Sequence, residues 1–132
     1  MRIRVVLATV TAAAIAFLMF PSPAQAAAAG VWRCSAQGNI PIGVLTVKSG
    51  GYSFQAVRNT VWAPKPQDSS NGSGKLTVKG SKVTVKNGPL RKQMGVTTGF
   101  YGSPASDASV HHEYLDLFND PSAAYLLRCY RP

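Results

Sequence analysis

Residues 75–86 read KLTVKGSKVTVK, with polar and apolar side chains in strict alternation on both sides of a central Gly-Ser pair. This period of two predicts strands that bury one face, and glycine at the first central position predicts a type II′ two-residue turn. The turn sets a register in which Lys79 faces Lys82 and Lys75 faces Lys86. Because a slip of one residue would bury the lysines, we expect a hairpin with one apolar face and one face of four lysines and two threonines.

A second hairpin is predicted at 44–57, with Gly50-Gly51 as its turn. The residues expected to pair on its buried face are Val47 with Phe54 and Leu45 with Ala56. A third hairpin is predicted at 111–130, with its turn at 119–122.

Further strands at about 31–36 and 95–101 bring the expected count to seven or eight. After residue 30 no stretch shows the apolar period of an amphipathic helix, so the chain is predicted to be all-β. Short strands and joined chain ends favour a small antiparallel β-barrel, because closure removes exposed strand edges. A two-sheet β-sandwich is the alternative. Residues 59–74 and 102–110 break the pattern and are expected to be loops.

The first 26 residues have the pattern of a cleavable secretory signal. Arg2 and Arg4 precede an uncharged apolar run that is shorter than the ~20 residues needed to span a bilayer. Ala24-Gln25-Ala26 then supplies the small-x-small pattern that signal peptidase recognises. We therefore expect residues 1–26 to be removed. Residues 27–132 should form one domain, monomeric and without a transmembrane segment, that is secreted or periplasmic.

Cys34 and Cys129, the only two cysteines, lie near the ends of the predicted mature chain. In an oxidising compartment an isolated pair predicts a disulfide. The pair has no C-x-x-C redox spacing and too few ligands for a structural zinc ion. Such a bond would close the barrel and make its first and last strands neighbours.

The layout resembles that of small exported bacterial β proteins of uncharacterised function. The elements that carry the resemblance are Gly43-x-Leu45-x-Val47, Tyr52-x-Phe54, Asn87-Gly88-Pro89-Leu90 after a strand, and the late Cys129. The resemblance covers most of the chain after the signal, and it implies no activity and no active site.

Basic side chains gather in residues 27–106, which hold ten Lys and Arg against one acid, Asp68. Loss of Arg2 and Arg4 with the signal would leave 12 basic and 5 acidic side chains, a net charge of +7. Like charges opposed across a strand pair weaken a hairpin, so we interpret the lysines as an anion-attracting face. The alternative is that lysines on a solvated face confer solubility and protect a strand edge from pairing. No aromatic residue lies among them, which disfavours stacking of nucleic acid bases.

The predicted binding residues belong to this face, to the segment after it and to one loop. They are Lys75, Lys79, Lys82, Lys86, Arg91, Lys92 and Trp62. Trp62 lies in a loop stiffened by Pro64 and Pro66, where it either contacts a partner or folds back onto one end of the core.

Catalytic and metal-binding patterns are missing from the sequence. His111 and Glu113 would share one strand face and His112 and Asp116 the other, so neither face offers three ligands. The run at 72–75 lacks the first glycine and the following helix of a phosphate-binding loop. There is no Gly-x-Ser-x-Gly elbow, and a Ser-His-Asp set assembled in space is the arrangement that the sequence leaves open. We expect no enzyme, no cofactor and no metal site.

The predicted function is that of a secreted, non-enzymatic binding module whose lysine-rich face contacts an anionic surface or polyanion. One alternative is an inhibitor of a secreted lysozyme or protease, acting through a loop at 59–74 or 87–94. The other is a barrel that carries a small ligand in its interior.

Overall fold

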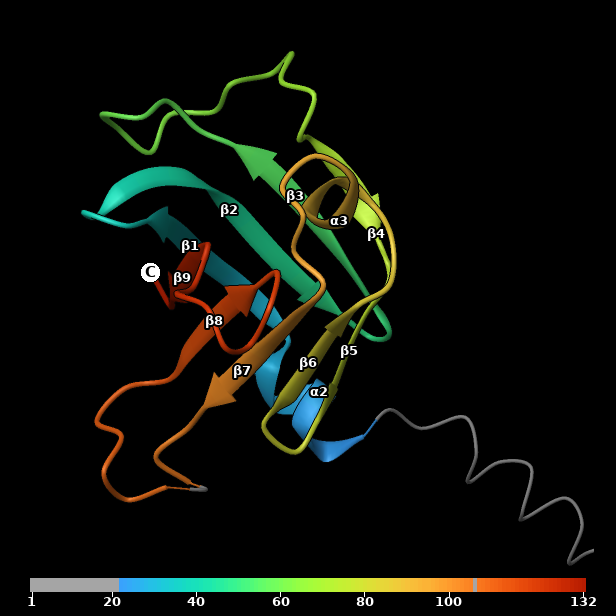
Figure 1. Cartoon of the computed structure of the whole chain (residues 1–132), viewed down its shortest axis with the longest axis vertical. Helices are drawn as coiled ribbons and strands as arrows, with labels where there is room; N and C mark the ends of the chain where they lie inside the picture. Colours follow the sequence, from blue (N-terminus) through green and yellow to red (C-terminus); the bar gives the residue numbers. More distant parts are fainter. Residues whose placement is uncertain (1–21, 106) are drawn as a thin grey trace, which may run out of the picture.

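The alternating sequence folds into nine antiparallel strands that form one nearly closed, barrel-like sheet (Figure 1). The computed structural model describes residues 22–105 and 107–132. The strands are β1 (Gly30–Ala36), β2 (Ile40–Lys48), β3 (Gly51–Ala56), β4 (Gly72–Gly74), β5 (Leu76–Lys79), β6 (Lys82–Val85), β7 (Thr98–Gly102), β8 (Tyr114–Phe118) and β9 (Leu127–Tyr130). Their order in the sheet is β4-β3-β2-β1-β9-β8-β7-β6-β5. The all-β prediction is confirmed, and the count exceeds the predicted seven or eight because the short β4 lies inside the expected loop at 59–74.

The hairpin of β5 and β6 has the predicted register. Lys79 pairs with Lys82, and each residue back to Leu76 and Val85 pairs as expected. Gly80 has a φ of +59°, the left-handed value that the first central residue of a type II′ turn requires. Beyond the strands, the backbone N–H of Lys86 donates to the carbonyl of Lys75 at 2.9 Å, so the lysine pairing extends to the end of the hairpin.

The hairpin of β2 and β3 differs from the prediction by two residues. Leu45 pairs with Phe54 and Val47 with Tyr52, because the turn lies at Ser49-Gly50 and Gly51 already belongs to β3. Only Gly50 takes a positive φ, +76°, so the second glycine is not needed in the turn. A register shift of two residues keeps every side chain on its predicted face of the sheet. The buried residues of this hairpin were therefore predicted correctly, whereas their cross-strand partners were not.

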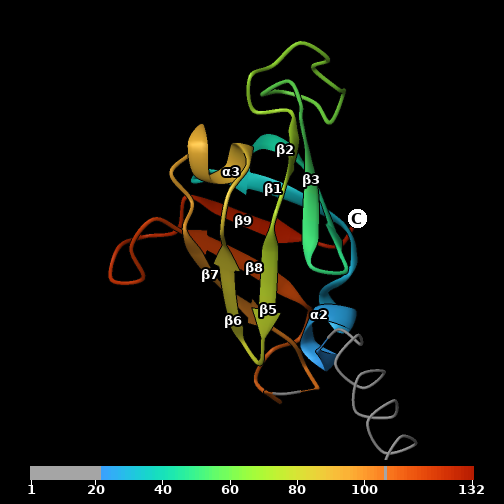
Figure 2. The ribbon, with the colours of Figure 1, turned by 90° about the vertical axis from the view of Figure 1, so that its right-hand side faces the viewer.

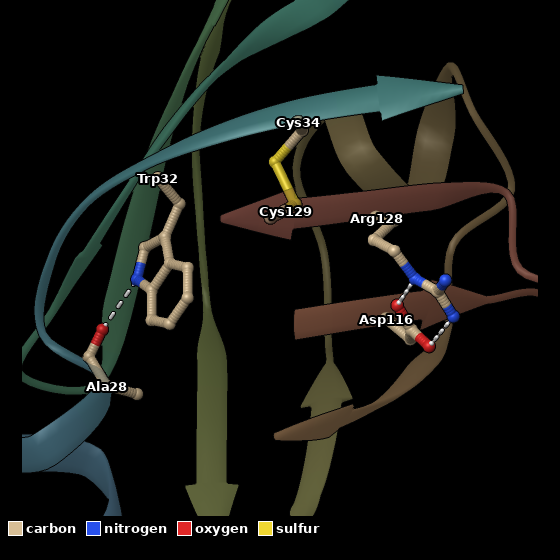
Figure 3. Close-up of a disulfide and its surroundings, with 6 residues drawn as sticks. All are labelled: Ala28, Trp32, Cys34, Asp116, Arg128 and Cys129. Carbon is tan, nitrogen blue, oxygen red and sulfur yellow. Dashed lines mark hydrogen bonds and ion pairs between the residues drawn. A yellow bond between two sulfur atoms is a disulfide. The ribbon is translucent and has the colours of Figure 1, made fainter. Parts of the chain in front are cut away.

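The predicted disulfide joins the first and last strands of the sheet. Cys34 of β1 lies directly opposite Cys129 of β9, with 4.0 Å between their Cα atoms and a bond between their sulfur atoms (Figure 3). In the third hairpin Leu115 pairs with Cys129 and Leu117 with Leu127. The return strand begins only at Leu127, so the connection is longer than the predicted turn at 119–122.

One continuous segment of chain closes the sheet. Residues 72–74 pair with β3 as β4, and residues 76–79 pair with β6 as β5, so the two edges are consecutive in sequence. At the corner, the side-chain oxygen of Asn87 accepts a hydrogen bond from the Lys75 N–H at 2.8 Å. The Tyr52 hydroxyl donates to the Asn87 carbonyl at 2.9 Å and accepts from the Leu90 N–H. Leu90 belongs to α3 (Pro89–Lys92), a single turn of helix in a segment for which no helix was predicted.

The other helix of the described residues, α2 (Pro23–Ala28), lies beside the lower half of β5 (Figure 2). The predicted cleavage motif Ala24-Gln25-Ala26 is part of it, whereas the signal up to residue 21 lies outside the described residues. Gln25 is buried against β5, and Ala28 is fully buried in the core. The folded barrel therefore uses residues on both sides of the predicted cut.

The inward side chains of the strands form one apolar cluster around Trp32, Leu45, Tyr52 and Leu115. The Trp32 indole N–H donates to the Ala28 carbonyl at 2.8 Å, so the polar atom of this buried ring has a hydrogen-bond partner (Figure 3). Neither helix in the described part of the chain has the length and apolar composition to cross a membrane.

Candidate anion-binding face

The outer surface of the β5–β6 hairpin carries the predicted lysines, and we call it the lysine face: Lys75, Lys79, Lys82 and Lys86 with Thr77 and Thr84. All four lysines are exposed, while the alternate residues Leu76, Val78, Val83 and Val85 are buried. Five of its six residues, all except Lys75, line a groove of about 280 Å³. Register alone brings these ammonium groups together, because each opposed pair comes from the two arms of one hairpin.

No carboxylate in the described ranges forms an ion pair with a lysine of this face. The acidic side chains that form ion pairs have other partners: Asp68 lies 3.2 Å from the Lys65 ammonium, Asp116 binds Arg128, and Glu113 binds Arg131. Hydrogen bonds from Ser70, aided by Lys65, lower the pKa of Asp68 to about 2. The positive charge of the lysine face is therefore uncompensated by neighbouring ion pairs.

Arg91 extends the lysine face at the end of β6. Its Nη1 donates to the Val85 carbonyl at 3.0 Å, which holds the exposed guanidinium next to Lys86. Lys92 follows it in α3 and is also exposed. Five of the predicted cationic residues thus lie on one hairpin and its immediate continuation, and the sixth, Lys92, is one residue further.

The structure also places an aromatic residue beside the lysines, which corrects the sequence-based view that none lies among them. Phe100 of β7 pairs directly with Lys82 of β6, and its side chain is 42% exposed. A second groove of about 440 Å³ runs over β6, β7 and β8, and its walls include Lys82, Phe100 and Phe118. The sequence could not show that Phe100 lies beside Lys82. Phe100 and Tyr101 are adjacent aromatic residues, and their position in the sheet decides that Tyr101 is buried and Phe100 is exposed.

Trp62 is not part of this face. It lies in the loop between β3 and β4, half-buried, with the Arg33 guanidinium 5.2 Å from its ring centroid. Arg33 belongs to β1, which is separated from β6 by β9, β8 and β7 in the sheet. The more exposed apolar side chain of this loop is the neighbouring Val61, at 50%. The predicted binding residues therefore divide into two surfaces.

The histidines at 111 and 112 are exposed and line a surface pocket with Glu113 and Arg131. Burial favours a higher pKa for Glu113, but hydrogen bonds from Tyr101 and Arg131 outweigh it and set that pKa below its ordinary value. Among residues 22–105 and 107–132, no three His, Cys, Asp or Glu side chains lie close enough together to hold a metal ion. The carboxylate here serves the ion pair with Arg131.

No family model matches the chain, and no curated protein or solved structure is detectably similar to it. The resemblance to small exported β proteins therefore stays a prediction.

Proposed function

We propose that this protein is an exported, non-enzymatic binding module that holds a polyanion against its lysine face. The observation that carries the proposal is the opposition of like charges on one hairpin, with no acidic ion-pair partner among the residues that the structure describes. Opposed lysines weaken a strand pair by a few tenths of a kcal/mol each, so they contribute nothing to folding at these positions. A bound chain of negative charges would remove that repulsion.

The shape of the surface supports a ligand with repeating charges. The lysines are distributed along the hairpin from Lys79 beside the turn to Lys86 at its open end, and Arg91 continues the row. The groove between them is lined from both strands of the hairpin, so an extended chain that crosses it can meet several lysines at once. Threonines 77 and 84 add hydroxyl groups that can donate hydrogen bonds to anionic oxygens.

The salt dependence of binding tests the proposal. Affinity of the exported protein for a sulfated polysaccharide column and for single-stranded DNA should fall steeply with salt, because counterions are released on binding. Changing Lys75, Lys79, Lys82 and Lys86 together to Gln should reduce the slope of log K against log salt by about 3 for single-stranded DNA, at roughly 0.7 per charge contact.

A matched control separates the face from net charge. The double variant Lys79→Gln/Lys82→Gln removes two charges from the face, and Lys48→Gln/Arg58→Gln removes two exposed charges elsewhere. Only the first pair should weaken binding by more than about threefold, since electrostatic steering by net charge alone acts on both equally. Equal losses in the two variants, or binding indifferent to salt, would contradict the proposal.

The β3–β4 loop carries the second candidate function, inhibition of a secreted hydrolase. The loop projects beyond the end of the barrel (Figure 1) and is held by its own hydrogen bonds. The Asn71 carboxamide accepts from the Ala56 N–H at 2.7 Å and donates to the Lys65 carbonyl at 2.9 Å. A loop fixed in this way loses little entropy on binding. Val61→Asp should abolish any inhibition of a lysozyme or protease, whereas Lys79→Gln/Lys82→Gln should leave it unchanged.

A further inference from the structure

The N-terminal segment, residues 22–28, covers the edge of β5 that pairs with no other strand. Because Thr77 and Lys79 hydrogen-bond to β6, the backbone groups of Leu76 and Val78 are directed to the other side of β5. Those groups would be the pairing edge for another strand. Three of these four groups are satisfied by side chains of α2 and of the residue before it.

Three groups of this edge are bound by Ser22 and Gln25. The Val78 N–H donates to Oε1 of Gln25 at 2.7 Å, and the Ser22 hydroxyl donates to the Val78 carbonyl at 2.8 Å. Nε2 of Gln25 donates to the Leu76 carbonyl at 3.4 Å and to the Lys48 carbonyl, at the end of β2, at 2.6 Å. One carboxamide therefore bridges the gap between β5 and β2.

These contacts specify a neutral amide. The Gln25 side chain is 4% exposed, and it meets two carbonyl oxygens and one N–H. A carboxylate in its place could accept from Val78 but would face both carbonyls without a proton to donate, and it would be a buried, unpaired charge.

A different set of contacts holds the residues that follow. Arg131 donates from Nη2 to the Ala27 carbonyl at 2.7 Å and from Nη1 to the Ala29 carbonyl at 2.8 Å. The Ala28 carbonyl accepts from Trp32. The predicted cut between Ala26 and Ala27 thus falls between two anchored parts. It would leave residues 27–29 in place and free residues 22–26 from their covalent link.

We propose that the slot along β5 is a peptide-binding site, which the uncut chain fills with its own residues 22–26. A cut after Ala26 makes the slot available to a separate peptide whose side-chain carboxamide takes the place of Gln25. The occupant is defined by chemistry: a short, uncharged peptide with a hydroxyl side chain three residues before an amide side chain. The site shares no side chain with the lysine face and does not depend on the polyanion proposal.

The test uses the exported protein, with its N-terminus determined by intact mass, and the blocked peptide Ser-Pro-Ala-Gln-Ala, which has the sequence of residues 22–26. Where the chain begins at Ala27, the peptide should shift the amide resonance of Val78 saturably, with a Kd of about 1 mM, equivalent to about 4 kcal/mol. The same peptide with Glu at the Gln position should bind at least about tenfold more weakly, a difference of 1.4 kcal/mol. No shift at Val78, or equal binding of the two peptides, overturns the proposal.

Where the exported chain retains Ser22, the same comparison is made within it. Gln25→Glu should increase hydrogen exchange at the Val78 amide by at least about tenfold, and the added Gln peptide should restore its protection. Ser22→Ala, which removes the hydrogen bond to the Val78 carbonyl and the N-cap bond from the Gln25 N–H but leaves the Gln25 carboxamide in place, gives a second variant should Gln25→Glu fail to fold. Protection unchanged by these substitutions, or not restored by the peptide, overturns the proposal.

Discussion

Asp116 and Arg128 face each other across β8 and β9, and two hydrogen bonds of 2.7 Å join the carboxylate to the guanidinium (Figure 3). Asp116 is also the cross-strand partner of Phe100 and lines the same groove as Lys82. The hydrogen bonds to Asp116 raise the pKa of Arg128. The carboxylate on this side of the lysine face therefore already has an arginine partner and forms no ion pair with Lys82.

Asp116→Asn should lower the free energy of unfolding by about 1–3 kcal/mol, because a buried carboxylate that accepts two charge-assisted hydrogen bonds is replaced by a neutral amide. The Arg128 side chain is 38% exposed, so solvent offsets part of the loss. Urea unfolding followed by fluorescence measures the change. Arg128→Lys keeps the charge without the planar fork, and it should fall between the wild type and Asp116→Asn. A loss no greater than about 0.5 kcal/mol, typical of an ordinary surface substitution, would show that the pair is not stabilising.

Reduction of the Cys34–Cys129 disulfide should lower the free energy of unfolding by about 4 kcal/mol, since the bond closes a loop across 95 positions in the unfolded chain. Thermal unfolding with and without reductant measures the effect. The variant Cys34→Ala/Cys129→Ala should behave like the reduced protein and should not respond to reductant. Two free thiols in the protein purified without reductant would contradict the predicted bond.

The sequence determined the β5–β6 hairpin because its local signals agree. The alternation of polar and apolar residues determines which face is buried. Gly80 takes a positive φ and Ser81 does not, which is the combination that a type II′ turn requires. The predicted disulfide followed from compartment and cysteine count. The hairpin prediction depends on residues that are close in sequence. The disulfide prediction depends on cysteine chemistry and does not require the register of any strand pair.

Predictions failed where two registers satisfy the same pattern. In the β2–β3 hairpin, either Ser49-Gly50 or Gly50-Gly51 can form the turn, and both keep the apolar residues inside. Phe100 lies beside Lys82 only because of the β6–β7 register, which connects elements with α3 between them. Residues 22–26 end in a predicted cleavage motif, so the sequence indicated their removal. Nothing in the local sequence predicted that they pack against β5. The registers of β2–β3 and β6–β7 and the packing of residues 22–28 depend on contacts that the alternation of polar and apolar residues does not specify.

Gly43→Ala should destabilise the barrel by about 1–3 kcal/mol through overpacking. A Cβ on Gly43 would lie 2.2 Å from Cζ of Phe54 and 2.8 Å from the Gln55 carbonyl oxygen, and the Phe54 ring is buried. Denaturant midpoints measure the cost. Phe54→Leu added to Gly43→Ala should recover part of the loss relative to the sum of the single variants, because the smaller side chain leaves room for the methyl group. Additive losses would show that the two residues do not compete for the same space.

Acid should weaken the contacts of the C-terminal Arg131 through Glu113. The pKa of Glu113 in the folded protein lies below its ordinary value of 4.5, so its contribution to stability is complete above pH 4.5 and is lost as the pH falls through the folded-state pKa. Carbon-detected NMR titration of the Glu113 carboxyl measures this pKa. In Glu113→Gln, the fall in stability over the same pH range should be smaller than in the wild type. A Glu113 pKa at or above 4.5 would contradict the role of Tyr101 and Arg131 as its hydrogen-bond donors.

Phe100→Ala should distinguish polyanions that carry rings from those that do not. The ring is exposed beside Lys82, where a base of a single-stranded oligonucleotide could stack while its phosphates meet the lysines. One base–aromatic stack contributes about 1–3 kcal/mol, so the affinity for an oligothymidylate should fall by about fivefold or more. The affinity for inorganic polyphosphate should not change, because that chain has no ring to lose. Phe100→Tyr retains a stacking surface and should bind both ligands as the wild type does. A loss of affinity for both polymers in Phe100→Ala would instead indicate that the ring shapes the lysine face, and no loss for either would show that the ligand contacts the lysines alone.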